Sequence, residues 1–343
     1  MFLSKTRSGI YYLYYTDNNG RRQKRSTKAR HKSEALKFLT TFKIEREEKR
    51  KPILFSALVA KFVQTSKTNL RDSTISLYER ARDVFIQIFG DMTIDKIGVY
   101  HWDMYKAIRL KKVSPITVNI ELRNLRSLMN KAFRWGLVVK NPLSLQPICF
   151  VPEKYPVYFT HDEFKVFYNT IPEQWFKDFV LFAVLTGMRR SELTNLLWKD
   201  IDVENKIVQI QSSPTFRTKS GKKRVLPLHD LLLPLVVNAK DHDPEELIFK
   251  YEGRKILGNH ITHKLKYVLK KSGIQKKGLH FHSLRHTFAS WLVQNGAAIY
   301  EVQRLMGHST IAVTEIYAHL QPMQLHDAVN RLDLIIKESD ANH

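Results

Sequence analysis

A proline-containing stretch without hydrophobic periodicity divides this chain and limits what it can fold into. The stretch "NPLSLQPICFVPEKYPVY" (141–158) follows a segment in which apolar residues recur at three- and four-residue spacing, and it precedes a segment with mixed patterns. Such spacing is typical of helices, whereas prolines without periodicity are typical of linkers. A chain of 343 residues is also too long for one ordinary hydrophobic core. We therefore expect a multidomain protein that is mainly α-helical with small β-sheets.

The segment before the linker, residues 54–148, predicts a small bundle of four helices. Stretches such as "STISLYERARDVFIQIFG" and "SPITVNIELRNLRSLMNKAFRWGLV" place their apolar residues on one helical face. Ser114 is expected to cap a helix, because Pro115 follows it at a first-turn position.

Residues 1–51 predict a small β-sheet with one helix. "GIYYLYYT" is β-prone, "DNNG" has the residues of a turn, and "RRQKRST" can return as a second strand, while a helical pattern starts at Ser33. Lys and Arg outnumber the acidic residues here threefold. A basic sheet suits a reader of DNA grooves, and a solvated charged hairpin is the alternative. The candidate DNA contacts are Arg21, Arg22, Lys24 and Arg25 in this segment, with Arg123, Arg126 and Lys131 in the helical one.

The last segment, residues 157–343, predicts a mixed α+β domain. Thr160 and Glu163 form a capping box at the start of a helix. "WFKDFVLFAVLTGMRRSELTNLLW" is an apolar helix pair broken at residues 186–187, and the strand-like stretches "NKIVQIQSS" and "KKRVLPL" follow it. Helical patterns continue from about Ile261.

The charge of the chain indicates a polyanionic partner. Lys and Arg number 56 against 33 Asp and Glu, which gives a formal net charge of +23. Neutralising phosphates releases condensed counterions, so DNA or RNA is the natural partner of such a chain. A merely basic protein or one that binds acidic membranes is the alternative. No apolar run of about 18 residues exists, no signal peptide is recognisable, and the single Cys149 suits the reducing cytoplasm.

Two arginine-bearing motifs stand out in the last segment. "TGMRRSEL" (186–193) sets two arginines in an apolar region, where a buried charge needs an anion or an acid such as Glu192 nearby. "LHFHSLRHTFASWL" (279–292) places His282 and Arg285 on one face of a helix that begins near His282. The four-residue spacing of His282 and His286 also allows a metal site, although the Glu of the H-E-x-x-H signature is absent.

A third motif, "RLMGHSTIAVTEIYAHL" (304–320), contains a histidine and a tyrosine. Gly307 is expected to end a helix and to leave His308 in a turn. Ser309 or Thr310 can cap a following helix, on which Tyr317 would lie about two turns in. A packed ring is the simplest reading of Tyr317 taken alone.

In this order, with the basic turn "TKSGKKRVLPL" between the first two, these motifs resemble the tyrosine recombinase (phage integrase) family. The likeness runs over about 157–325. Residues 54–148 resemble that family's core-DNA-binding domain, a SAM-like four-helix fold, and residues 1–51 are similar to the arm-binding domains of integrases. The resemblance implies that residues 157–343 form the catalytic domain of a site-specific DNA recombinase that needs no metal, ATP or other cofactor.

The family's reaction is transesterification through a 3′-phosphotyrosyl link. The resemblance implies that Tyr317 is the nucleophile and that Arg189 and Arg285 hold the non-bridging oxygens of the scissile phosphate. His308 would donate a hydrogen bond to the same phosphate. We expect the cationic and donor groups around Tyr317 to lower the cost of forming its phenolate.

The resemblance also assigns the proton transfers. Lys219, in the basic turn, would protonate the leaving 5′-oxygen, with Lys222 or Lys223 as alternatives for this role. A solvated basic hairpin that only contacts the DNA backbone is the other interpretation of all three lysines. His282 would assist proton transfer to and from the tyrosine. Glu192 would position an arginine or His282 without reacting itself.

The implied partners are double-stranded DNA and further copies of the chain. The tail "QLHDAVNRLDLIIKES" has apolar residues at helical spacing. In this family such a helix passes between protomers of a DNA-bound tetramer, and packing on its own domain is the alternative. An integrase of a mobile genetic element, working on core and possibly arm-type sites with accessory DNA-bending or directionality proteins, would act in the cytoplasm at the nucleoid. A catalytically silent DNA-binding protein and a relaxing topoisomerase are the competing interpretations.

Overall fold

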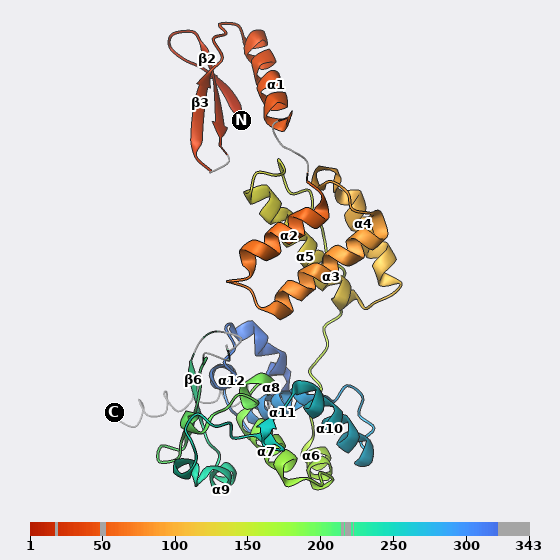
Figure 1. The fold of residues 1–343 in the computed structure, drawn as a ribbon, viewed down its shortest axis with the longest axis vertical. Helices are drawn as coiled ribbons and strands as arrows, with labels where there is room; N and C mark the ends of the chain where they lie inside the picture. Colours follow the sequence, from red (N-terminus) through yellow and green to blue (C-terminus); the bar gives the residue numbers. More distant parts are fainter. Residues whose placement is uncertain (18–19, 49–52, 214–215, 217–220, 222, 322–343) are drawn as a thin grey trace, which may run out of the picture. The chain divides into compact units, whose positions relative to one another are not determined.

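The computed structural model describes residues 1–17, 20–48, 53–213, 216, 221 and 223–321, and the chain divides into two compact units, 1–153 and 154–343 (Figure 1). The boundary between the units lies inside the linker predicted at 141–158. A further division of the first unit near residue 51 stays a prediction. Within the described ranges, no helix combines the length and the apolar character needed to cross a membrane.

The N-terminal residues form an antiparallel sheet and one helix (Figure 1). Strand β2 (Tyr11–Thr16) lies between β1 (Phe2–Lys5) and β3 (Arg22–Ser26), and helix α1 spans Lys32–Glu48. The sequence pattern predicts β2, β3 and the helix but not β1, because "FLSK" is short and largely exposed and so shows no clear alternation. Leu13 on β2 and Ala35 on α1 are fully buried.

Four α-helices follow within residues 53–153, as the periodicity predicts. They are α2 (Phe55–Ser66), α3 (Asp72–Phe89), α4 (Val99–Leu110) and α5 (Pro115–Arg134). Their apolar faces meet in one core that contains Phe55, Phe85, Trp102 and Tyr105. The side chain of Ser114 accepts a hydrogen bond from the backbone N–H of Thr117 and caps α5 as predicted.

The first part of the predicted linker is packed on this bundle. The indole N–H of Trp102 donates to the carbonyl of Pro147 at 2.9 Å. The side chain of Asn119 pairs with the backbone of Cys149, because its amide donates to the carbonyl at 2.8 Å and its oxygen accepts from the N–H at 2.7 Å. The free linker is therefore shorter than the sequence pattern suggested.

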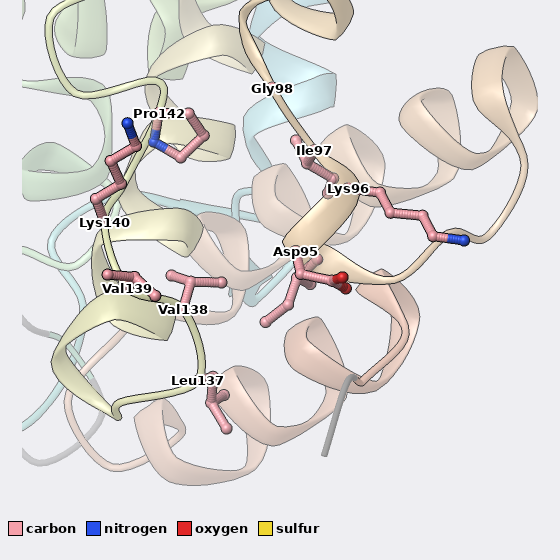
Figure 2. Close-up of a pocket in the computed structure, with 10 residues that line it drawn as sticks. Asp95, Lys96, Ile97, Gly98, Leu137, Val138, Val139, Lys140 and Pro142 are labelled. Carbon is pink, nitrogen blue, oxygen red and sulfur yellow. The ribbon is translucent and has the colours of Figure 1, made fainter. Parts of the chain in front are cut away.

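A pocket of about 520 Å³ opens on the same bundle (Figure 2). In Figure 2, Val138, Val139 and Lys140 lie on one side of it, and Asp95, Lys96 and Ile97 lie on the other. One carboxylate and two ammonium groups among aliphatic side chains provide no nucleophile or general base suited to neutral pH. The candidate site therefore lies in the C-terminal unit.

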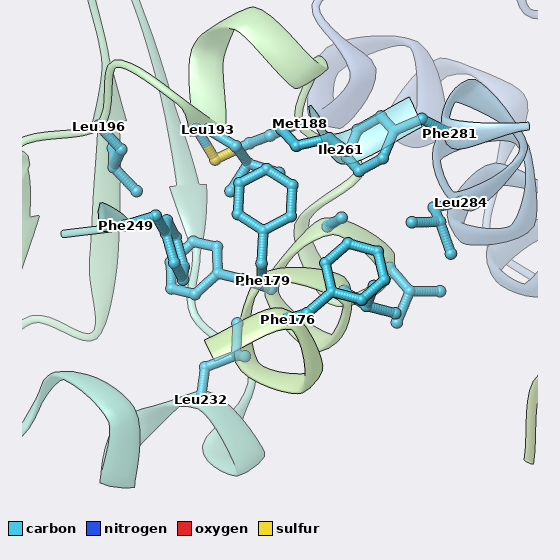
Figure 3. Packing of buried hydrophobic residues seen from close by; sticks show 14 of the residues in the cluster. Phe176, Phe179, Met188, Leu193, Leu196, Leu232, Phe249, Ile261, Phe281 and Leu284 are labelled. Carbon is cyan, nitrogen blue, oxygen red and sulfur yellow. The ribbon is translucent and has the colours of Figure 1, made fainter. Parts of the chain in front are cut away.

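The C-terminal unit surrounds the apolar helix α7 with helices and small sheets. Phe176 and Phe179 of α7 pack with Phe249, Phe281 and Leu284 in its core (Figure 3). Strands β4, β5 and β6 form an antiparallel sheet, and β7 with β8 forms a hairpin that the sequence analysis missed. The elements are α6 (His161–Asn169), α7 (Gln174–Thr186), α8 (Arg190–Leu193), β4 (Ile201–Asp202), β5 (Ile207–Ile210), β6 (Arg224–Pro227), α9 (Leu233–Val236), β7 (Lys250–Tyr251), β8 (Arg254–Lys255), α10 (Gly258–Lys271), α11 (Phe281–Gln294) and α12 (Ile299–Met306).

Helix α11 carries apolar side chains into two clusters. Phe281 and Leu284 belong to the main core, while Ala289 and Val293 pack in a second cluster with Tyr317. The predicted capping box of Thr160 and Glu163 is present at the start of α6.

Candidate active site

Arg189 is placed by a chain reversal at the end of α7. Gly187 has a φ of 60°, which is left-handed backbone that favours glycine. A Cβ at this position would lie 2.3 Å from Cδ1 of Phe288, so a larger residue does not fit. Met188 then enters the core, and Arg189 becomes the N-cap residue of the one-turn helix α8.

The buried carboxylate of Glu192 holds Arg189. The backbone N–H of Arg189 donates to Oε2 and its Nη1 donates to Oε1, both at 2.8 Å. Burial alone would raise the pKa of Glu192, but the hydrogen bond and charge of Arg224 and then those of Arg189 lower it to about 2. Glu192 is therefore ionised at neutral pH.

The second arginine on this carboxylate, Arg224, was missed by the sequence analysis. Its Nη1 donates to Oε1 of Glu192 at 3.0 Å and its Nη2 donates to Oε2 at 2.7 Å. One signal was available in the sequence. In a strand, Arg224 shares a face with Leu226 two residues later, and Leu226 is buried.

Arg285 ties the first and third motifs together from α11. Its Nη1 donates to the carbonyl of Gly187 at 2.6 Å, and its Nη2 donates to the carbonyl of Met306. The side chain is fully buried and has no carboxylate partner among the described residues. Burial, followed by the charge of Arg189, lowers the pKa of Arg285 to about 9, so it remains protonated at neutral pH.

A pocket of about 310 Å³ is lined by Arg189 and Arg285, and it carries uncompensated positive charge. Three guanidiniums, those of Arg189, Arg224 and Arg285, lie near the carboxylate of Glu192 in the described part of the chain. Such a concentration of charge attracts an anion. The lining consists of Arg189, Arg190, Ser191, His282, Arg285, His308 and Val313.

The two histidines of the pocket are held neutral. Burial, followed by the charges of His286 and Arg285, lowers the pKa of His282 to about 3. Burial and the charge of Arg285 lower the pKa of His308 to about 4. Nδ1 of His308 lies 2.9 Å from the hydroxyl of the buried Thr314, which leaves its other ring nitrogen available to a ligand.

Tyr317 does not line this pocket. Its ring is 1% exposed, and its hydroxyl lies 2.5 Å from Nδ1 of His286. Burial raises the pKa of Tyr317 to about 12 against the opposing charge of Arg285, while burial lowers that of His286 to about 4. The hydroxyl is therefore the donor in a neutral hydrogen bond. The charge of Arg285 eases ionisation of Tyr317 in the expected direction, but in this conformation the effect of burial is larger.

The backbone around Tyr317 also differs from the prediction. Gly307 ends α12 with a φ of 62° and His308 lies in the turn, as expected. The next segment is not one α-helix but two short 3₁₀ turns, η5 (Ile311–Val313) and η6 (Glu315–Leu320), and neither has a side-chain cap. Tyr317 lies in the second turn, packed against α11 and α12.

The histidine spacing also suggested a metal site. His282 and His286 lie close on α11, with ring centroids 4.9 Å apart, and His280 lies 6.4 Å from His282 by the same measure. Among the residues that the structure describes, no three His, Cys, Asp or Glu side chains gather as a metal would require.

The candidate DNA contacts of the N-terminal sheet lie on or beside β3. Arg21, Arg22, Lys24 and Arg25 are all exposed. The guanidinium of Arg25 lies over the rings of Phe38 and Phe42, at 5.8 and 5.5 Å from their centroids. Arg25 therefore also contributes to the packing of α1.

The other candidate DNA contacts differ in exposure. Arg123 is exposed on α5. Arg126 requires a correction, because its guanidinium donates to the carbonyls of Leu143 and Gln146 and stacks on Trp102, which makes it a structural residue of the bundle. The ammonium of Lys131 lies over Trp135, and Lys223 is exposed before β6. Lys219 and Lys222 lie outside the described residues.

Acidification is expected to destabilise the C-terminal unit. His282, His286 and His308 have pKa values of about 3, 4 and 4 in the folded chain, below the value of 6.5 for an unperturbed histidine. Between pH 4 and 6.5 the unfolded chain binds more protons, so the free energy of unfolding falls as the pH is lowered. The slope is up to about 1.4 kcal/mol per pH unit for each of the half-buried His286 and His308, and smaller for His282, whose side chain is exposed to solvent. Urea unfolding at pH 7, 6 and 5 measures this, and a stability that does not fall would contradict it.

Residues 158–324 match the phage integrase family. The tyrosine recombinase XerC of Pediococcus pentosaceus is 27% identical over 300 residues, which cover 80% of this chain and 97% of that protein. The integrase of transposon Tn1549, solved with transposon right-end DNA, superposes with a TM-score of 0.68 at 22% identity, covering 82% of this chain and 100% of that one. A lambda integrase tetramer bound to a Holliday junction superposes with a TM-score of 0.63 at 17% identity, covering 90% of this chain and 95% of that one.

These similarities agree with the site and extend beyond it. The matched residues contain every element that supplies the pocket, from α7 to the turn after α12. The superpositions also cover a larger share of this chain than residues 158–324. This chain is therefore a tyrosine recombinase of the phage integrase family, an enzyme of site-specific DNA recombination.

Proposed function

We propose that this recombinase cleaves and rejoins DNA at the pocket formed by Arg189, Arg285 and His308. The observation that carries the proposal is the convergence of these three residues, from α8, α11 and the turn after α12, on one cavity with excess positive charge. Guanidiniums bind phosphate oxygens through paired donors and stay protonated, which suits a site that must stabilise a more highly charged transition state.

The proposed reaction is a transesterification. The phenolic oxygen of Tyr317 bonds to phosphorus while the bond to the 5′-oxygen breaks, and a 3′-phosphotyrosine results. The phenolic proton passes to His282, which is neutral in the pocket and becomes more basic when an anionic phosphate binds beside it. Lys219, assigned by resemblance alone, protonates the leaving 5′-oxygen. Attack by a 5′-hydroxyl of the partner strand reverses these steps, so no ATP is needed.

Tyr317 has to leave its observed partner before it can react. Its hydroxyl donates to His286, which is not part of the pocket lining, and its ring is packed in the second cluster. We propose that DNA binding shifts η6 so that the hydroxyl exchanges Nδ1 of His286 for the phosphate. A short 3₁₀ turn suits this movement, because few backbone hydrogen bonds have to break.

Substitution of His286 is expected to accelerate cleavage. His286→Leu removes the acceptor that stabilises the buried position of Tyr317, and one hydrogen bond of about 1 kcal/mol corresponds to a rate gain of about fivefold. The initial rate of covalent adduct formation measures the gain, with His263→Leu, an exposed position on α10, as the control. Slower cleavage would show that His286 takes part in proton transfer instead.

We further propose that the first unit binds DNA. The exposed basic side chains on and beside β3 suit arm-type sites, and Arg123 and Lys131 on α5 suit the core site. The integrase of transposon Tn1549 was solved on transposon-end DNA, which supports an integrase of a mobile genetic element here. Such an enzyme acts in the cytoplasm at the nucleoid, with accessory DNA-bending or directionality proteins as possible partners.

Assembly on DNA is proposed to be tetrameric. The lambda integrase with the same fold was solved as a tetramer on a Holliday junction, which supports this state. The tail from residue 322, predicted to dock on a neighbouring protomer, lies outside the described residues. Cross-linking on junction DNA with and without residues 322–343 tests the assignment, and a tetramer that forms equally well without the tail would contradict it.

A nicked suicide substrate tests the reaction itself. Loss of the small 5′ fragment traps the phosphotyrosine, so a covalent protein–DNA adduct is expected on the cognate site without added metal. No adduct on any cognate site would favour a catalytically silent DNA-binding protein. Relaxation of supercoiled DNA without strand exchange would favour a topoisomerase, and sensitivity of the adduct to EDTA would revive the metal alternative.

A further inference from the structure

Arg224 is buried next to the pocket but is not part of its lining. Its side chain is 10% exposed, and the side chain of its partner Glu192 is 1% exposed. A buried arginine costs several kcal/mol in desolvation unless its hydrogen bonds are well made. The bidentate pair with Glu192 provides such bonds, and Arg224 contributes more than Arg189 to keeping this buried carboxylate ionised.

The sharing of Glu192 determines what Arg189 can offer to a ligand. Each carboxylate oxygen accepts one hydrogen bond from Arg189 and one from Arg224. Arg189 consequently gives only one guanidinium nitrogen, Nη1, to the carboxylate. Within the described ranges, its Nε and Nη2 have no hydrogen-bond partner and remain for an anion in the pocket. Without Arg224, both oxygens would be open to a bidentate pair with Arg189.

The opposite side of Arg224 lies against the turn that presents His308. A Cβ at Gly307 would come 2.7 Å from Cδ of Arg224 and 3.0 Å from its Nε. The turn residue therefore rests directly on the arginine side chain. Because Gly307 is also in left-handed backbone, this close contact and the turn require the same residue.

We propose that Arg224 is a positioning residue of the recombination site. It orients Arg189 through Glu192 and supports the Gly307–His308 turn, so that Arg189 and His308 contact the same phosphate. The inference rests on the proposed cleavage reaction and extends it to a residue outside the pocket. Arg224 is not a catalytic residue in this proposal, because it acts through Glu192 and the turn.

The test compares full-length Arg224→Met and Arg224→Lys with the wild type and with Arg254→Met, an exposed arginine on β8. Single-turnover cleavage of the nicked substrate is expected to fall about 100-fold in Arg224→Met, the size of effect that a misplacement of about 1 Å produces. Arg224→Lys keeps the charge without the paired donors, and it is expected to cleave about tenfold faster than Arg224→Met. Noncovalent DNA binding and the melting temperature are measured for each variant alongside cleavage.

A titration of His308 by NMR gives a readout independent of cleavage. Arg285, Arg189, Arg224 and His286 all face His308 and all lower its pKa. Loss of the Arg224 charge is therefore expected to raise the pKa of His308, whereas Arg224→Lys should leave it nearer the wild-type position. This ordered shift would show that the charge of Arg224 lies beside His308 in solution, as the proposed support of the turn requires.

The outcomes separate this inference from the proposed reaction. If the wild type forms no adduct, the cleavage proposal fails, while the His308 titration still reports on Arg224. If Arg224→Met cleaves as well as Arg254→Met, or if its His308 titrates as in the wild type, the positioning role is overturned. Equal loss of folding in Arg224→Met and Arg224→Lys would also overturn it, because the role would then be structural.

Discussion

Tyr317→Phe is expected to abolish the covalent protein–DNA adduct while the chain still folds and binds DNA. Phenylalanine keeps the ring that packs between α11 and α12, so the second cluster is preserved. The lost hydroxyl leaves Nδ1 of His286 without its partner, which costs about 1–2 kcal/mol. In a unit of this size, that corresponds to a fall in melting temperature of only a few degrees.

Three measurements check this result. Adduct formation on the nicked substrate reports cleavage, a gel-shift titration reports binding, and thermal unfolding reports stability. Tyr300→Phe is the matched control, because Tyr300 lies on α12 and is 61% exposed. A ring that served packing alone would leave cleavage unchanged in Tyr317→Phe, and a persistent adduct would show that another residue is the nucleophile.

Arg285→Met is expected to lower the rate of cleavage about 10³-fold or more with little change in stability. A guanidinium that stabilises phosphoryl transfer is worth about 10³–10⁵ in rate. Its removal leaves the carbonyls of Gly187 and Met306 without donors, at about 1–3 kcal/mol for each. The same substitution removes a fully buried charge that has no carboxylate partner among the described residues, a gain of several kcal/mol. These contributions oppose each other and are similar in size.

Arg285→Met is thus expected to lose activity without losing stability. Urea unfolding and single-turnover cleavage of the same samples measure both quantities, with Arg304→Met, an exposed arginine on α12, as the control. Arg285→Lys should also be inactive, because one ammonium cannot reach both carbonyls and a phosphate as a planar guanidinium does. A large loss of stability together with substantial remaining cleavage would show that Arg285 serves the fold and not the phosphate.

Much of the site was predictable because short-range rules govern it. Gly187 and Gly307 end helices α7 and α12 as their positions in the sequence suggest. The three-residue spacing of His282 and Arg285 on α11 brings both to the pocket. Capping boxes and periodicity identified the helices, because these depend on residues within a few positions of each other.

Other features depended on contacts that no local pattern encodes. Arg224 reaches Glu192 across 32 positions of sequence, and the strand face that it shares with Leu226 is only a weak local signal of its burial. The internal role of Arg126 depends on where residues 143 and 146 pack. The short 3₁₀ turns around Tyr317 replace the expected helix, and their packing against α11 and α12 is likewise a tertiary effect.

The sequence by itself determined the basic character and the order of the motifs, and it predicted which side chains are proposed to bind phosphate. These follow from residue type and spacing, which persist whatever the surroundings. Only the tertiary structure decided how the side chains are partnered and charged. Desolvation and the neighbouring positive charges lower the pKa values of His282 and His308, so both are neutral at pH 7. Hydrogen bonds from two arginines share Glu192, and packing holds Tyr317 outside the pocket as a neutral donor to His286. Desolvation and hydrogen bonding are properties of packed neighbours, and those neighbours come from distant parts of the chain.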